Sequence, residues 1–148
     1  MLANVVPNDL MVLYSKMADS GERGAVPLKY VETLDHGSVI DVGDLVAGAA
    51  RRVAGRLTLP VGERLPPDST VTLFRQTAWD FLTVPVADDG TFATHAIPEE
   101  PLSLSVGVRG YRLADKYGRA RRAVPLAPLE RDRTLSLPLE PAPAAPPR

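Results

Sequence analysis

The sequence contains no cysteine among its 148 residues. This absence excludes disulfide bonds, zinc sites with thiolate ligands and cysteine nucleophiles. Only two histidines are present, His36 and His95, and neither has a second histidine or a carboxylate at the spacing of a metal site. We therefore expect both histidines at the surface or at a strand edge, and neither as a metal ligand or a general base.

Long hydrophobic runs and an excess of charge of one sign are also absent. No apolar run approaches the roughly 18 residues that a membrane helix needs. The stretch Met1–Asp19 has no basic start, and Pro7, Asn8 and Asp9 interrupt it, so it is not typical of a signal peptide. The formal net charge of −1 argues against general binding to nucleic acid or to a membrane surface. Either the protein is cytosolic or the chain is a fragment of a longer one, and the sequence favours the second explanation.

What the sequence does contain is a series of short segments in which apolar and polar residues alternate. Along Leu102–Val108, for example, leucine and valine alternate with serine and glycine. Such alternation is typical of strands with one buried face, and Asp89-Gly90 is the pair that a tight hairpin favours. The pattern predicts an all-β, Ig-like or prealbumin-like antiparallel β-sandwich over Arg51–Glu140. The expected strands are Arg52–Leu59, Thr70–Gln76, Phe81–Val86, Thr91–His95, Leu102–Val108 and Arg133–Leu139, with a long loop at Gly110–Arg133.

Residues 1–50 look like the end of a module rather than the beginning of one. Val6–Leu10 resembles Ile97–Leu102, and Ser38–Leu45 occupies the place that Arg133–Leu139 occupies later in the chain. We interpret these residues as the C-terminal part of an upstream, similar β module plus a linker, with chance similarity as the alternative. Such a part should be unable to close a sandwich alone, so we expect it to pack on the main module or to fray. The strands expected there are Leu10–Ser15, Val26–Glu32 and Val39–Val42, followed by a linker at Leu45–Arg52.

The last residues, 141–148, read PAPAAPPR. A segment of proline and alanine has too little apolar side-chain bulk to build a core. We expect a semi-rigid linker or a disordered end.

Several short motifs follow one another in order between Val53 and Tyr111. They are Val53-x-Gly55-Arg56, Val71-Thr72-Leu73, Asp88-Asp89-Gly90-Thr91-Phe92, Ile97-Pro98, Leu104-x-Val106 and Gly110-Tyr111. In this order and spacing the segment resembles the carboxypeptidase regulatory-like domain, a prealbumin-like sandwich related to the B-type repeats of bacterial adhesins. The match covers the first part of one such module.

The resemblance implies a non-enzymatic module that serves for spacing, stabilisation or ligand contact, often in tandem arrays of exported bacterial proteins. It brings no catalytic residue, no cofactor and no metal ligand, and it implies an extracytoplasmic location. Related adhesin repeats join a lysine of the first strand to an asparagine of the last. Here the first strand has Arg56 in place of lysine and the last has no asparagine, so we expect no such crosslink.

Two features are candidates for contact with a partner. Trp79, the sole tryptophan, lies in a short turn, where it could stack on a sugar, anchor a partner, or fold back as a plug over the open end of the sandwich. The sequence favours the plug. The basic cluster Lys116–Arg122, with Arg119, Arg121 and Arg122, could contact phosphate or an acidic polysaccharide, but a solvated loop is the better interpretation.

Four aspartates could together suggest a calcium site, because oxygen-rich loops bind Ca²⁺ in extracellular sandwiches. No twelve-residue calcium loop accompanies them, and Asp-Gly is primarily a turn signal. We therefore expect turn chemistry and no metal. These residues are Asp41, Asp44, Asp88 and Asp89.

Two functions of different classes remain. The preferred one is a non-catalytic binding or spacer module of a larger, exported protein, whose partner is a protein, a polysaccharide or a neighbouring domain. The alternative is a small hydrolase or lyase with its site at the Trp79 end, which would need a pocket with at least two titratable groups.

The order of the strands also predicts which loops share an end. If each strand crosses the sandwich once, successive connections alternate between its two ends. Pro60–Ser69, Ala87–Gly90 and Gly110–Arg133 should then lie together, opposite the turns that contain Trp79 and Pro98–Glu100. This would place Asp68, Asp88 and Asp89 beside the basic cluster and partly neutralise it.

Overall fold

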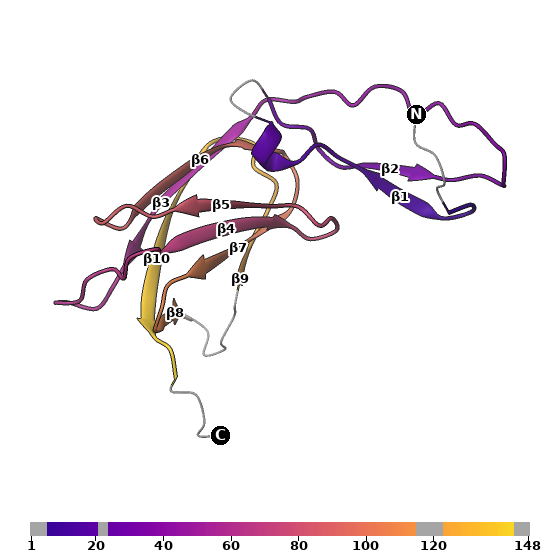
Figure 1. Ribbon diagram of the computed structural model, residues 1–148. Helices are drawn as coiled ribbons and strands as arrows, with labels where there is room; N and C mark the ends of the chain where they lie inside the picture. The colour runs from indigo at the N-terminus through magenta and orange to yellow at the C-terminus, as the bar shows by residue number, and fades with distance from the viewer. Residues whose placement is uncertain (1–5, 21–23, 115–122, 144–148) are drawn as a thin grey trace, which may run out of the picture.

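The computed structural model describes residues 6–20, 24–114 and 123–143. Over these residues the chain folds as two four-stranded β-sheets with a smaller N-terminal arm beside them (Figure 1). One sheet has the strand order β6-β3-β10-β8 and the other β5-β4-β7-β9. The predicted all-β sandwich is confirmed. The elements are β1 (Leu10–Leu13), the 3-10 helix η1 (Met17–Asp19), β2 (Lys29–Glu32), β3 (Arg51–Thr58), β4 (Thr70–Arg75), β5 (Phe81–Pro85), β6 (Thr91–Ile97), β7 (Leu102–Gly107), β8 (Tyr111–Leu113), β9 (Ala123–Leu126) and β10 (Arg133–Pro141).

The six strands expected in the main module are present as β3, β4, β5, β6, β7 and β10, with ends one or two residues from the predicted ones. The Asp89-Gly90 turn also forms: Gly90 has a φ of 85°, and its N–H donates to the carbonyl of Ala87 at 2.8 Å. The turn does not close a hairpin within one sheet, however, because β5 pairs with β4 and β6 pairs with β3. It carries the chain from one sheet to the other.

The prediction of one long loop at Gly110–Arg133 is wrong, because this segment contains two further strands, β8 and β9. These strands are only three and four residues long, which is too short to show a period, and a proline interrupts β9. β8 starts beside the end of β10, and β9 ends beside the start of β7. The chain therefore returns across the sandwich between β7 and β10, and β10 pairs parallel to β3 instead of antiparallel.

Two expectations for residues 1–50 are also wrong. Val39–Val42 forms no strand, and Val39 is 90% exposed. The expected linker is shorter than predicted, since Arg51 already begins β3 and Gly48 forms an isolated bridge with Ala25. The division of the chain at residue 50 into two modules stays a prediction.

The predicted grouping of the loops holds for Pro60–Ser69, Ala87–Gly90 and the start of Gly110–Arg133, but it is wrong for the end of that last segment. After β9 the chain is at the opposite end of the sandwich, where the Asp132 carboxylate accepts the N–H of Arg52 at the start of β3. The contacts between the loops agree with this. At one end, the N–H of Leu57 donates to the carbonyl of Gly90 at 2.8 Å, and the Tyr111 hydroxyl donates to the Glu63 carboxylate. The turn with Trp79 lies at the opposite end. The neutralising contact with the basic cluster stays a prediction, because Lys116–Arg122 lies outside the described residues.

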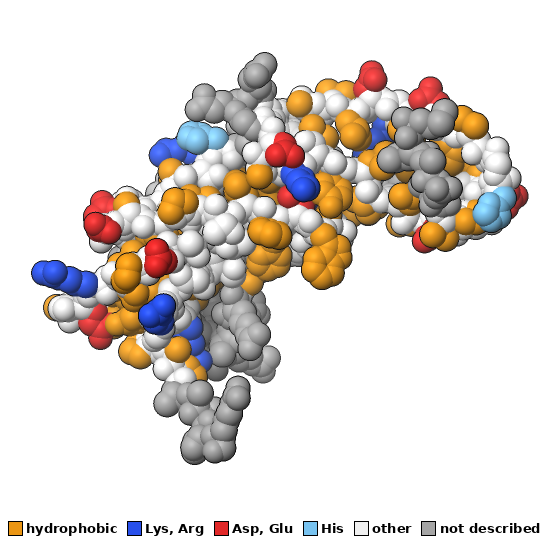
Figure 2. Space-filling model, in the orientation of Figure 1, with side chains coloured by type: hydrophobic (Ala, Val, Ile, Leu, Met, Phe, Trp, Pro, Cys, Tyr) orange, Lys and Arg blue, Asp and Glu red, His pale blue; other side chains and the backbone are white. Residues whose placement is uncertain are grey.

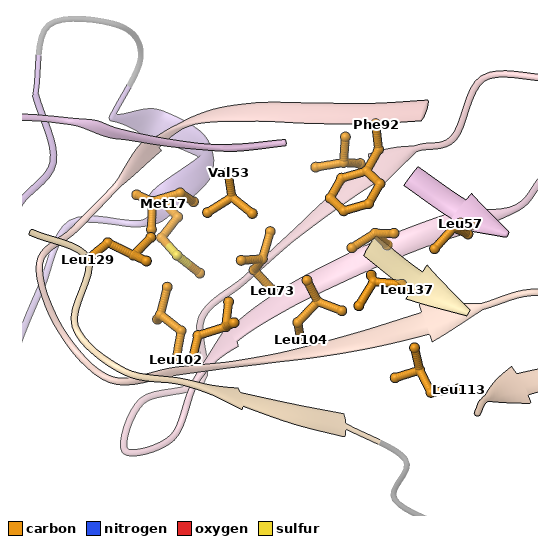
Figure 3. Packing of buried hydrophobic residues seen from close by; sticks show 14 of the residues in the cluster. Met17, Val53, Leu57, Leu73, Phe92, Leu102, Leu104, Leu113, Leu129 and Leu137 are labelled. Atoms are coloured by element: carbon orange, nitrogen blue, oxygen red, sulfur yellow. The ribbon is translucent and has the colours of Figure 1, made fainter. Parts of the chain in front are cut away.

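The core lies between the two sheets and is built by the inward-facing residues of the alternating strands (Figure 3). Gly55 on β3 shows how tightly the strands approach. A Cβ there would lie 2.6 Å from the carbonyl oxygen of Leu135 and 2.7 Å from the ring of Phe92. The glycine of the Val53-x-Gly55 motif therefore leaves room for Phe92, its cross-strand partner.

One core residue comes from outside the predicted module. Met17, in η1, is 1% exposed and belongs to the same cluster as the leucines of the sheets. Figure 3 shows it at the end of the core that also contains Leu129 and Leu102. η1 contacts β5 and β6, the strands at one edge of each sheet. Met17 thus closes this end of the sandwich.

The arm that carries η1 is a two-stranded antiparallel sheet of β1 and β2, which extends away from the sandwich (Figure 1). The Thr33 hydroxyl ties its ends together, since it donates to the carbonyl of Val6 and accepts the N–H of Asp9 at 2.8 Å. Two strands alone are marginally stable in water, so the arm depends on the sandwich for its order. In the described part of the chain, no helix is long and apolar enough to cross a membrane.

Candidate binding surface

Trp79 is 97% exposed, so the prediction that it folds back as a plug is wrong. The plug at this end of the sandwich is Met17 instead. The turn that carries Trp79 is nevertheless firmly closed: the N–H of Arg75 donates to the carbonyl of Asp80 at 3.1 Å. The indole is therefore held out into solvent by a fixed turn.

Beneath this turn lies a buried cluster of charges. The Arg75 side chain has no exposed surface, and its Nε lies 3.2 Å from Asp80 and 3.0 Å from Glu100. Neither contact has hydrogen-bond alignment, and Nη1 has no partner among the described residues. The cluster joins the two turns at this end of the sandwich, because Asp80 precedes β5 and Glu100 precedes β7.

The N-terminal segment completes the cluster with backbone groups. Arg75 Nη2 donates to the carbonyl of Val26 at 2.8 Å. The N–H of Met17 donates to Asp80 at 3.0 Å, and the N–H of Leu28 donates to Glu100 at 2.8 Å. These three bonds fasten Met17, Val26 and Leu28 to the sandwich, as the sequence hypothesis of packing on the main module requires.

Burial raises the pKa of the Glu100 carboxyl above its usual value of 4.5, and it outweighs the opposing effects of the Leu28 N–H and the Arg75 charge. A raised pKa in the folded state means that Glu100 contributes most to stability when it is protonated. That contribution is fully present below the unfolded pKa and is lost as the pH rises through the folded one.

We therefore compare the natural chain with the variant Glu100→Gln, which cannot titrate at this position. The stability advantage of the natural chain over the variant, measured as the difference between their free energies of unfolding, should fall as the pH rises from about 4 through the folded pKa of Glu100. Urea denaturation of both proteins at a series of pH values measures this difference, and the other titrating groups cancel in it. A difference that rises with pH would show that the Arg75 charge, and not burial, dominates at Glu100.

The outer face of the sheet β5-β4-β7-β9 is the surface next to Trp79. Strand register gives three rows of outward-facing residues across this sheet. None of these residues is charged, although 24% of the chain is. The rows are Phe81, Phe74, Ser103 and Pro125; Thr83, Thr72, Ser105 and Ala123; and Pro85, Thr70 and Gly107. We name these eleven residues the uncharged face.

Aromatic side chains gather at the end of the uncharged face nearest the arm. Phe81 is 65% exposed and Tyr30 of β2 is 52% exposed, in addition to Trp79. The hydroxyl of Tyr30 lies 3.2 Å from that of Thr77 in the Trp79 turn, so the arm borders this end of the face. Figure 2 shows hydrophobic side chains grouped over the ends of β4 and β5 that point toward the arm.

The outer face of the other sheet is different in character. It has a shallow depression of about 910 Å³, in which the small side chains Ala54 and Ala93 lie between Arg52 and Arg56. Arg56 is paired with Asp89 at 3.7 Å. This face carries charged side chains, in contrast to the uncharged face.

The aspartates that could have suggested a metal site act in turns instead. Asp89 accepts hydrogen bonds from the N–H and hydroxyl of Thr91, and these bonds lower the pKa of its carboxyl. Asp41 accepts from the N–H of Gly43. Within the ranges that the structure describes, no three His, Cys, Asp or Glu residues are grouped to hold a metal ion.

Both histidines are exposed, as expected. His36 lies in the turn after β2. His95, on β6, lines a small depression of about 310 Å³ with Ala50, Arg52 and Asp132, where the Asp132 carboxylate accepts the N–H of Arg52. No hydroxyl or thiol side chain lines this depression within the described residues, so His95 has no nucleophile to activate there.

Of the predicted contact residues, the structure places only Trp79. Arg119, Arg121 and Arg122 lie outside the described residues. The buried cluster of Arg75, Asp80 and Glu100 was not predicted from the sequence. A signal for it existed: Val71, Leu73 and Arg75 share the inward face of β4, so the alternation placed an arginine where an apolar residue was expected.

No model of a protein family matches the chain, and no curated protein does. Among solved structures, a DUF3823 family protein from Parabacteroides merdae has a similar arrangement, with a TM-score of 0.43 and 19% sequence identity. The similarity covers 62% of this chain and 46% of that protein. This chain thus spans less than half the length of the solved structure it matches.

Proposed function

We propose that this chain is a non-catalytic module of a larger, exported bacterial protein, in which it spaces neighbouring parts and presents a binding surface. The proposed kind of module is the carboxypeptidase regulatory-like domain. The motifs of that resemblance occupy structural positions consistent with it: Val53, Leu73 and Leu104 are buried in the core, and Asp89-Gly90 forms a turn.

The parallel pairing of β3 with β10 carries the spacer part of this proposal. The first and last strands of the module lie side by side and run in the same direction, from Arg133 beside Val53 to Pro138 beside Thr58. The chain therefore enters the sandwich at one end and leaves it at the other. Modules that are linked in this way extend end to end instead of folding back on themselves.

The same pairing determines how the module would respond to tension. Pulling on the start of β3 and the end of β10 loads the hydrogen bonds between them in shear, so that they must break together. Pulling on the adjacent starts of both strands peels the bonds apart one at a time.

Because the chain has no cysteine, two cysteines can be introduced in each variant as the attachment points for pulling. We expect the pair Arg52→Cys and Ala142→Cys to unfold at markedly higher force than the pair Arg52→Cys and Thr134→Cys in single-molecule pulling. All three positions are exposed, so the replacements should leave the fold intact. Equal forces in the two geometries, or a lower force in shear, would contradict the spacer proposal.

The alternative of a hydrolase or lyase at the Trp79 end has less support. Three titratable groups at that end, Arg75, Asp80 and Glu100, are buried and contact one another and the N-terminal backbone. A general acid or base must reach its substrate within hydrogen-bond distance. In this geometry, these groups act as a structural cluster.

A further inference from the structure

We infer that the uncharged face, together with Trp79, binds an uncharged polysaccharide. This inference rests on the proposed function as a binding module and names the class of its ligand. A neutral glycan presents hydroxyl groups and apolar C–H faces and carries no charge. A surface that recognises it needs aromatic rings, neutral hydrogen-bonding groups and no charges that would lose hydration on contact.

The polar groups of the uncharged face are of the required kind. The hydroxyls of Thr72 and Thr83 lie 3.1 Å apart on neighbouring strands. Beside the face, the exposed Gln76 donates through Nε2 to the hydroxyl of the buried Ser103 at 3.2 Å. A hydroxyl can donate one hydrogen bond and accept two, and an amide has two donors and an acceptor, so the exposed Thr83 hydroxyl and Gln76 amide have capacity left for a ligand.

The aromatic rings are positioned to stack. Trp79 has the largest ring and nearly its full surface in solvent, and Phe81 is two residues along the chain at the edge of the face. The Arg75 N–H to Asp80 carbonyl bond and the buried cluster fix the turn that carries Trp79. A turn that is already fixed loses little backbone freedom when a ligand stacks on the ring that it carries.

The size of the face also favours a narrow ligand over a protein. Eleven positions, each about 4.8 Å wide across the strands and about 6.7 Å long along them, give an area of about 350 Å². A stable protein interface covers about 800 Å² on each partner. An extended glycan chain needs only a strip of surface, and the row that ends at Phe81 lies next to the turn with Trp79.

The sole tryptophan provides the test, because its fluorescence reports on this site alone. We expect neutral oligosaccharides, drawn from a panel of cellohexaose, maltohexaose, xylohexaose and mannohexaose, to shift Trp79 emission to shorter wavelength in a saturable way. Hexagalacturonate, a charged oligosaccharide, should give no such shift. Because Trp79→Ala removes the fluorophore, calorimetry measures binding by the variants.

By calorimetry, Trp79→Ala should weaken binding by about tenfold or more, since it removes the main stacking surface. Trp79→Phe should retain part of the affinity, and Thr83→Val should weaken binding without changing the packing of β5. Val61→Ala is the matched control: Val61 is a fully exposed apolar residue in the loop at the other end of the sandwich, and its removal should leave binding unchanged.

Three results would overturn the inference. The first is that no neutral oligosaccharide binds at concentrations up to about 10 mM, where even weak recognition is measurable. The second is binding that Trp79→Ala leaves intact. The third is self-association in sedimentation that Trp79→Ala abolishes, which would make the surface an interface between copies of this chain. If no oligosaccharide binds but the pulling experiment gives a higher unfolding force in the shear geometry, the glycan inference is wrong and the spacer proposal is still supported.

Discussion

Replacing Arg75 by methionine is expected to lower the free energy of unfolding by about 3–5 kcal/mol, which is the usual cost of leaving buried charge without its partner. Methionine retains most of the apolar stem, so the loss comes mainly from the guanidinium. Without it, the carboxylates of Asp80 and Glu100 remain buried near one another with no cation in contact. Urea denaturation followed by circular dichroism measures the effect.

The chain offers a matched control for this prediction. Arg112 pairs with Glu140 at 2.7 Å, but both side chains are more than a third exposed. Water solvates the carboxylate when Arg112 is replaced, so Arg112→Met should cost only about 0–1 kcal/mol. Similar losses for the two variants would mean that the Arg75 cluster is hydrated and has no special importance for the fold.

A triple variant distinguishes the net contribution of the whole charge cluster to stability from the loss of stability when only Arg75 is removed. Arg75→Met with Asp80→Asn and Glu100→Gln removes all three charges together. Because some contacts in the cluster lack hydrogen-bond alignment, its net contribution is expected to be small. The triple variant should therefore recover much of the stability that Arg75→Met alone loses.

The strands of the main module could be predicted from the sequence because most of them alternate over five or more residues, and the Asp89-Gly90 turn marks the start of β6. β8 and β9 could not be, since three or four residues give no period and Pro125 interrupts β9. Because β8 and β9 were not predicted, the last strand was expected to run antiparallel to β3, whereas β10 runs parallel to it. The error in topology thus follows from two short strands that depend on tertiary packing.

The candidate surface could be predicted only in part. Trp79 was identified by its position in a turn, but whether it points inward or outward depends on what already fills the end of the core. That space is occupied by Met17, which lies 62 residues earlier in the chain, in a segment without hydrophobic periodicity. The uncharged face likewise depends on β9 and on the register between strands, neither of which the sequence determines locally.

Met17→Ala is expected to lower the free energy of unfolding by about 2–5 kcal/mol, the range for deleting a large buried side chain. Met17 is the part of residues 1–50 that belongs to the core, packed at the end where η1 contacts β5 and β6. The strands that η1 contacts belong to different sheets, and their pairing limits how far they can move to fill the space. If the N-terminal segment is part of the sandwich in this way, the loss should appear in the single unfolding transition of the whole module.

Met11→Ala makes the same chemical change in β1, where the side chain is only partly buried and lies in the arm. We expect it to cost less than about 1 kcal/mol and to loosen the arm without shifting the main transition. Hydrogen exchange would show the distinction, since amides of β1 and β2 should exchange faster in Met11→Ala while those of β4 and β7 keep their protection.

Equal effects of the two variants, or protection of residues 6–50 as a unit independent of β4 and β7, would show that the N-terminal segment is a module of its own. Because Met17, Val26 and Leu28 all contact the sandwich through their side chains or backbone, the structure predicts one cooperative unit with a frayed arm.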